Sequence, residues 1–199
     1  MTPHALAMTH NPAVLSWVGE IASLTQASEV AWCEGSACER RELVAGAALA
    51  GTLLSTGWPS AVSYRGPDSR VCGLDRLVFV CTPSRAEVSR ANNWMSPRAA
   101  YKKMRSLTAA SLRSGTLYVV PHMSEPQVAG APEVGISVTN AFQAILGISA
   151  GGGMGRAALQ SLGQTECFSR GFHVQLSSTP TRLLRFHFPE DRATWTICS

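Results

Sequence analysis

The chain has 199 residues, 45% of them hydrophobic and 15% charged, which is enough for one globular domain with a buried core. Its net charge of +4 comes from scattered Lys and Arg, which argues against nucleic acid as a partner. We find no apolar run of the roughly 20 residues that a transmembrane helix needs, so no membrane partner is expected.

We therefore expect a single domain over residues 1–199, with residues 1–10 loosely attached. The six cysteines show no zinc-ligand spacing, and the N-terminus does not resemble a secretory signal. These patterns predict free thiols, no metal site and a cytoplasmic location.

Helical and strand patterns alternate through the first half of the chain. Asn11 and Pro12 are typical of a helix start, and Ser36 and Glu39 have the spacing of a capping box. In order, the patterns predict a helix from Pro12, a strand over 29–33, a helix from Ser36 to about Leu54, strands over 61–65 and 77–82, and a polar loop over 83–91.

The central segment runs from Ala91 to Pro121. Ser96 can cap a helix that begins at Pro97, where a missing N–H costs nothing. Gly115 is suited to end this segment, and residues 116–120 read as a buried strand that Pro121 stops.

The second half is richer in strand patterns. It predicts a loop over 122–133, strands over 134–138 and 142–149, a break at 151–153, a helix over 154–162, and strands over 172–176, 183–188 and 194–198. Residues 142–149 are assigned to a strand because apolar residues alternate there. The expected fold class is α/β (α+β), a mixed sheet flanked by helices.

Five motifs follow one another in the order of a known family. They are VAWCEGS at 30–36, NNWMSP at 92–97, GTLYVVP at 115–121, VGISVT at 134–139 and FPEDR at 188–192. With these motifs the chain resembles the N-terminal domain of GTP-dependent phosphoenolpyruvate carboxykinase. The resemblance implies that domain's fold, and it implies that the family's phosphate loop and metal ligands lie beyond Ser199, so no cofactor is expected for this chain.

The resemblance also suggests a substrate contact. The family grips its small carboxylate substrate with an arginine in the loop before the strand at 77–82, and Arg70 is the nearest candidate by order. The alternative is that Arg70 is a solvated loop residue.

Departures from the family suggest a cavity. Gly151, Gly152 and Gly153 stand where the family has bulky residues, and a sheet thinned in this way can enclose an apolar space. Tyr118 and Trp94 are candidate walls of that space, although both can equally be core residues.

His122 and Glu125 follow the strand at 116–120 and are candidate catalytic residues. Such a pair can move a proton if burial brings the two pKa values near neutrality. The alternative is that both are exposed loop residues without a role.

Three functional hypotheses remain open at this point. The first is a carboxykinase-like domain, lacking the phosphoryl-transfer machinery, that binds a small apolar molecule or organic acid and perhaps isomerises, cyclises or decarboxylates it. The second is a regulatory or assembly domain without catalysis. The third is the N-terminal part of a split carboxykinase with a separately encoded partner subunit. A homo-oligomer is compatible with each, and whether the chain is an enzyme stays open.

Overall fold

The computed structural model describes residues 8–49, 53–55, 62–64, 75–124, 133–149, 153–177 and 180–199. The first half contains α1 (Pro12–Thr25), β1 (Glu29–Trp32), α2 (Ala37–Leu49), β2 (Leu53–Ser55), β3 (Val62–Tyr64), β4 (Asp75–Val80), the short 3-10 helix η2 (Arg85–Glu87) and β5 (Asn93–Trp94). The second half contains α3 (Pro97–Thr108), β6 (Thr116–Ser124), β7 (Glu133–Thr139), α4 (Phe142–Ser149), α5 (Arg156–Leu162), β8 (Ser169–Gln175), β9 (Arg182–Phe188) and β10 (Ala193–Cys198).

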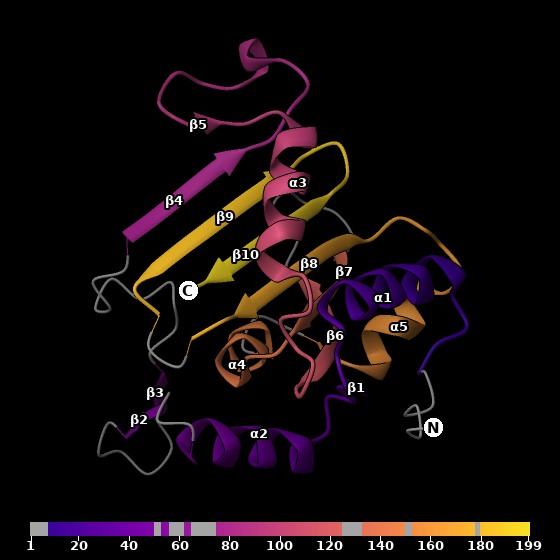
Figure 1. The fold of residues 1–199 in the computed structure, drawn as a ribbon. Helices are drawn as coiled ribbons and strands as arrows, with labels where there is room; N and C mark the ends of the chain where they lie inside the picture. Colours follow the sequence, from indigo (N-terminus) through magenta and orange to yellow (C-terminus); the bar gives the residue numbers. More distant parts are fainter. Residues whose placement is uncertain are drawn as a thin grey trace.

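Eight of the described strands form one mixed sheet in the order β1-β6-β7-β8-β10-β9-β4-β5 (Figure 1). Two of its neighbouring pairs, β6–β7 and β10–β9, are antiparallel, and the other pairs between neighbouring strands are parallel. Strands β2 and β3 form a separate antiparallel pair. The predicted fold class, a mixed sheet flanked by helices, is confirmed.

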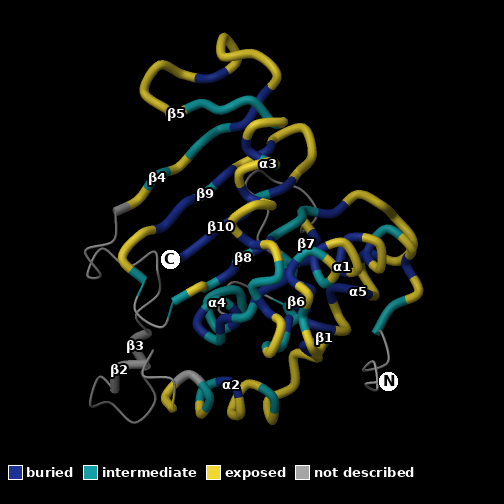
Figure 2. The backbone as a smooth tube through the Cα atoms, viewed as in Figure 1, coloured by how far each residue is buried: buried dark blue, intermediate teal, exposed yellow. Residues whose placement is uncertain are grey.

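Helices cover both faces of this sheet. One face packs against α1, α3 and α5 through a large apolar core that includes Val14, Met104, Leu159, Phe172 and Trp195. A smaller cluster lies on the other face, where Leu43 of α2 and Ile145 of α4 pack against Cys33 and Val120. The buried segments run through the middle strands, as Figure 2 shows.

Asn11 fixes the start of α1 as the sequence predicts. It is fully buried, and its side-chain oxygen accepts hydrogen bonds from the backbone N–H groups of Ala13 and Val14. Its side-chain nitrogen donates to the carbonyls of Gly163 and Thr165, which lie just beyond α5. One side chain therefore caps α1 and ties it to the C-terminal end of α5.

We expect Asn11→Ala to lower the free energy of unfolding by about 2–3 kcal/mol, because it removes a helix cap and the two hydrogen bonds that tie α1 to the end of α5. Urea denaturation followed by circular dichroism measures this loss. Ser84→Ala is a suitable control, because Ser84 caps only the exposed turn η2 and should cost less than about 1 kcal/mol. Equal losses in the two variants would contradict the role given to Asn11.

The segment 142–149 is the helix α4, so the predicted strand is wrong. Phe142, Ile145, Leu146 and Ser149 recur at intervals of three and four, and this face packs between β6 and α2. The hydroxyl of Thr139 accepts a hydrogen bond from the N–H of Ala141 just before the helix. The five apolar residues of this segment fit both alternation and intervals of three and four, so the pattern did not decide between strand and helix.

Strand β6 continues to Ser124, past the predicted stop at Pro121. The carbonyl of Pro121 accepts from the N–H of Gly155, on the side of β6 away from β7. Since the N and C=O of one strand residue face the same side, the missing N–H of proline removes no bond to β7. The loop predicted over 122–133 is therefore shorter, and its residues 125–132 lie outside the described part of the chain.

Two predicted helices end earlier than expected. Helix α2 ends at Leu49, and Leu53 already belongs to β2. Helix α3 ends at Thr108 instead of near Gly115, because the N–H groups of Ala110 and Leu112 donate to the carbonyls of Leu24 and Thr25 at the end of α1. A tertiary contact therefore replaces the last helical turns.

Candidate functional site

His122 lies within β6, not on a loop as the sequence suggested. Its imidazole is partly buried, with Nε2 3.0 Å from the hydroxyl of Ser137. Gly135 stands directly opposite, and a Cβ there would lie 2.4 Å from Cε1 of His122. Glycine at position 135 therefore makes room for the imidazole, and burial lowers the pKa of His122 below its ordinary 6.5.

This pKa shift predicts how stability depends on pH. Above pH 6.5 the imidazole is neutral in both the folded and the unfolded chain, so it costs nothing. As the pH falls below 6.5, only the unfolded chain takes up the proton readily, and the folded state loses stability. Thermal melts from pH 7.5 to 5 should show this loss.

His122→Gln should flatten the pH dependence in that window, because glutamine fills a similar volume without titrating. His187, which is exposed on β9, provides the control variant His187→Gln, which should leave the pH profile of the wild type in place. A profile that is identical in all three proteins would contradict burial of a neutral His122.

The glycines expected to open a cavity are only partly described. A Cβ on Gly153 would lie 2.3 Å from the terminal methyl of Met123, so Met123 fills this position. The backbone of Gly153 accepts from the N–H of Met123. Gly151, Gly152, Glu125 and Arg70 lie outside the described residues, so their proposed roles stay predictions.

Tyr118 lines a hollow of about 290 Å³ between β1, β6, α2 and α4. Its ring packs against Phe142 at a centroid distance of 5.4 Å. The wall of the hollow consists of Ala31, Trp32, Cys33, Glu39, Glu42, Leu43, Tyr118 and Phe142. Burial raises the pKa of Tyr118, so its hydroxyl is protonated and can donate a hydrogen bond.

Glu39, which lines this hollow, makes one of the two hydrogen bonds of the predicted capping box. The hydroxyl of Ser36 accepts from the N–H of Glu39, whose carboxylate accepts from the N–H groups of Glu34 and Gly35. Burial, together with this carboxylate, raises the pKa of the Cys33 thiol to about 12. Cys33 is therefore a neutral thiol in the wall and not a nucleophile.

Trp94 does not share a site with Tyr118. It lies in β5 at one end of the strand order, whereas Tyr118 lies in β6 near the other end. Its indole N–H donates to the carbonyl and the hydroxyl of Thr82. Trp94 therefore lies at the edge of the sheet formed by the described strands.

A row of polar side chains crosses the sheet on the face that carries α4. Tyr118 pairs in register with Thr139, Thr139 with His173, His173 with Thr196, and Thr196 with Arg185. The hydroxyl of Thr139 and Nδ1 of His173 are 3.0 Å apart, and Nε of Arg185 donates to the hydroxyl of Thr196 at 3.3 Å. We call these five residues the polar row.

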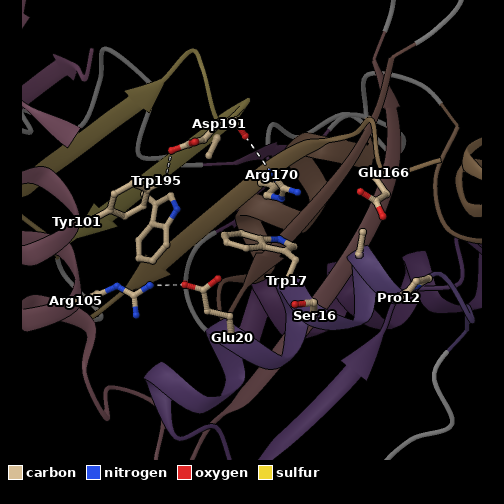
Figure 3. A pocket seen from close by; sticks show the side chains of 12 residues that line it. Pro12, Ser16, Trp17, Glu20, Tyr101, Arg105, Glu166, Arg170, Asp191 and Trp195 are labelled. Carbon is tan, nitrogen blue, oxygen red and sulfur yellow. Dashed lines mark hydrogen bonds and ion pairs between the residues drawn. The ribbon is translucent and has the colours of Figure 1, made fainter. Parts of the chain in front are cut away.

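A second hollow, larger than the one beside Tyr118, lies on the opposite face, between α1, α3 and the strands β8 and β10. It has a volume of about 740 Å³, within the usual range for small-molecule sites. Twelve residues line it: Pro12, Ala13, Ser16, Trp17, Glu20, Tyr101, Arg105, Glu166, Arg170, Asp191, Ala193 and Trp195. Figure 3 shows their side chains, and we call this hollow the α1–α3 cleft.

The aromatic floor of the α1–α3 cleft could not be located from the sequence. Trp17, Tyr101 and Trp195 come from α1, α3 and β10, and they meet only because these elements pack on one sheet face. The sequence shows only that these aromatic residues belong to apolar patterns, and such patterns indicate a core and not a cleft. An ion pair between Glu20 and Arg105 joins the two helices at the rim.

The described residues offer no metal centre, because no three His, Cys, Asp or Glu side chains gather in a way that could hold a cation. Within the same part of the chain, none of the helices combines the length and the apolar character needed to cross a membrane.

Comparison with known proteins identifies similar sequences. The family model described as phosphoenolpyruvate carboxykinase N-terminal domain matches residues 16–199. The chain is 34% identical, over its whole length, to "Phosphoenolpyruvate carboxykinase [GTP]" of Anaeromyxobacter dehalogenans (strain 2CP-C). It is 28% identical over 97% of its length to the protein of that name from Corynebacterium jeikeium (strain K411). In both comparisons it spans 34% of the length of the relative.

Proposed function

Because the chain belongs to the family of phosphoenolpyruvate carboxykinase N-terminal domains, we propose that it supplies the organic-acid-binding part of a carboxykinase-type enzyme. The observation that carries this proposal is the match of the whole chain to one third of enzymes named phosphoenolpyruvate carboxykinase [GTP]. The remaining two thirds of such an enzyme would come from a second part that binds GTP and metal.

The polar row supports this assignment because its chemistry suits a small carboxylate. A guanidinium group can hold a carboxylate through paired, charge-assisted hydrogen bonds, and Arg185 presents one beside the hydroxyl of Thr196. The hydroxyl of Thr139 and the imidazole of His173 lie along the same row, where they bond to each other, and Nε2 of His173 is 3.5 Å from Sγ of Cys198. In this proposal the row binds and orients the organic acid.

In this proposal, GTP and the metal are bound by the second part of the enzyme. The described residues form no group that fits a divalent cation, so we derive no step through one here. Phosphoryl transfer would be the task of the second part, and this chain would position the acid and exclude water from it.

The test is reconstitution with the missing two thirds of the Anaeromyxobacter dehalogenans relative. The 199-residue chain and that fragment are mixed with oxaloacetate, GTP and Mn²⁺, and formation of phosphoenolpyruvate is measured. Turnover should require both parts. Arg185→Gln should reduce it at least tenfold, whereas Arg98→Gln, an exposed change on α3, should stay within twofold of the wild type. Failure of the two parts to give any turnover contradicts the proposal.

A second candidate function is the binding of a small, largely apolar molecule, with its transformation in the absence of metal and nucleotide. The hollow of about 290 Å³ beside Tyr118 favours it. His122, the expected base, lies four residues from Tyr118 along β6, or about 13 Å, so one small ligand would not touch both. Tyr118→Ala should abolish any ligand-induced rise in Tm that is found, and His122→Ala should not.

A further inference from the structure

The α1–α3 cleft combines an aromatic floor with charges of both signs. Trp17 and Trp195 meet edge to face at a centroid distance of 6.1 Å, and Tyr101 packs edge to face on Trp195 at 5.9 Å. Most of the charged groups of the rim already have partners. The carboxylate of Asp191 accepts from the hydroxyl of Tyr101 at 2.7 Å, and Glu20 pairs with Arg105.

Arg170 is held in a fixed position at this rim. Its guanidinium lies over the ring of Phe168, 5.0 Å from the ring centroid, and one of its nitrogens donates to the backbone carbonyl of Asp191 at 3.2 Å. A guanidinium has five N–H donors, so most remain available for a ligand. Stacking and one hydrogen bond thus orient a donor group without saturating it.

Glu166 supplies the opposite charge on the same side of the cleft. Its carboxylate forms no hydrogen bond or ion pair with any described residue, and it is exposed in the segment between α5 and β8. In Figure 3, Arg170 and Glu166 lie on one side of the Trp17 indole, and the Glu20–Arg105 pair lies on the other. No ion pair joins Glu166 to Arg170, so each can face a ligand.

We propose that the α1–α3 cleft is a binding site for a zwitterionic amino acid with an aromatic or large apolar side chain. The carboxylate of the ligand meets Arg170, its ammonium group meets Glu166, and its side chain packs on Trp17 and Tyr101, which both contact the almost fully buried Trp195. Cation–carboxylate contacts give the orientation, and the aromatic floor provides the apolar contact area.

This site is separate from the polar row. The residues of β8 and β10 that line the cleft, Arg170, Ala193 and Trp195, lie on the face of the sheet opposite to His173 and Thr196. A ligand in the cleft would therefore not occupy the organic-acid site proposed above. The two proposals can fail independently, because this one is tested by binding alone.

The test uses L-phenylalanine as the probe and the 199-residue chain as the protein. Trp17 and Trp195 lie in the cleft, so their fluorescence should change in a saturable way as the amino acid is added. Two analogues separate the contacts: 3-phenylpropionate lacks the ammonium group, and phenethylamine lacks the carboxylate. We expect each analogue to bind at least tenfold more weakly than L-phenylalanine.

Matched variants test which charged side chain contacts the carboxylate and which contacts the ammonium group of the ligand. Glu166→Gln should weaken L-phenylalanine at least fivefold and leave 3-phenylpropionate unchanged, whereas Arg170→Gln should weaken both acids and leave phenethylamine unchanged. Circular dichroism checks that each variant is folded, and Glu190→Gln, an exposed change outside the cleft, should alter nothing. No saturable signal up to 10 mM (a concentration on the order of the weakest useful affinities), or equal affinities for all three compounds, overturns the proposal.

Discussion

Replacing Trp195 by alanine is expected to lower the free energy of unfolding by about 3–5 kcal/mol, among the largest effects of any single substitution in this chain. Trp195 is 1% exposed, and it contacts the rings of Trp17, Tyr101 and Phe172 edge to face. These rings join α1, α3 and β8 to β10. The variant therefore loses buried area and several aromatic contacts together, and a cavity remains.

Guanidinium denaturation followed by far-ultraviolet circular dichroism measures this loss without relying on tryptophan fluorescence. Trp94→Ala is the matched control, since Trp94 is only half-buried at the edge of the sheet and should cost less than half as much. A loss below about 1 kcal/mol for Trp195→Ala would contradict its place at the centre of the core.

Gly155→Ala is expected to cost more than about 3 kcal/mol, because the new Cβ has no room. A Cβ at Gly155 would lie 2.0 Å from the carbonyl oxygen of Glu34, and φ is +73°. Gly35 makes the reciprocal approach, at 2.5 Å from the carbonyl oxygen of Met154. Both obstacles are backbone atoms, so relief requires the segments at 34–35 and 154–155 to move apart.

Gly163 provides the control for the backbone conformation alone. Its φ is +57°, and a Cβ there would meet nothing within 4 Å. Gly163→Ala should therefore cost only the about 1–3 kcal/mol of an alanine held at a positive φ with ψ at −125°. Thermal and urea unfolding of both variants separate the cost of the backbone conformation from the cost of the close contact. Equal losses in stability would show that the close approach at Gly155 does not contribute.

Most elements of this fold could be predicted because local signals and tertiary structure agree. Asn11 and the Ser36–Glu39 pair stand where helices begin, and each makes the hydrogen bonds that its residue type suggests. The strands over 134–138 and 183–188 appear within one residue of their predicted bounds. Ser96 marks the start of α3 too, although its hydroxyl makes no capping bond.

The predicted helices and strands were wrong where long-range contacts determine the local structure. The end of α3 depends on carbonyls of α1, and the tolerance of β6 for Pro121 depends on Gly155, which is 34 positions away. The period of residues 142–149 is ambiguous in the sequence and is set by packing of α4 on β6 and α2. None of these partners can be identified from a local pattern.

The candidate sites were harder to predict than the fold. His122 and Tyr118 were singled out, and both lie on one face of β6, but Trp94 lies at the far edge of the sheet. The polar row was missed because its members come from five strands whose order the sequence does not reveal. A site made by cross-strand register becomes visible only when the strand pairs are known.

The measurement that tests the polar row most directly is a phosphoenolpyruvate titration of the isotope-labelled chain, followed by nuclear magnetic resonance. If the row binds the organic acid, the signals of Thr139, His173, Thr196 and Arg185 should shift together with one Kd, and Arg185→Gln should weaken that Kd at least fivefold. Shifts confined to the α1–α3 cleft, or no shifts at saturating phosphoenolpyruvate, would contradict the assignment of the polar row.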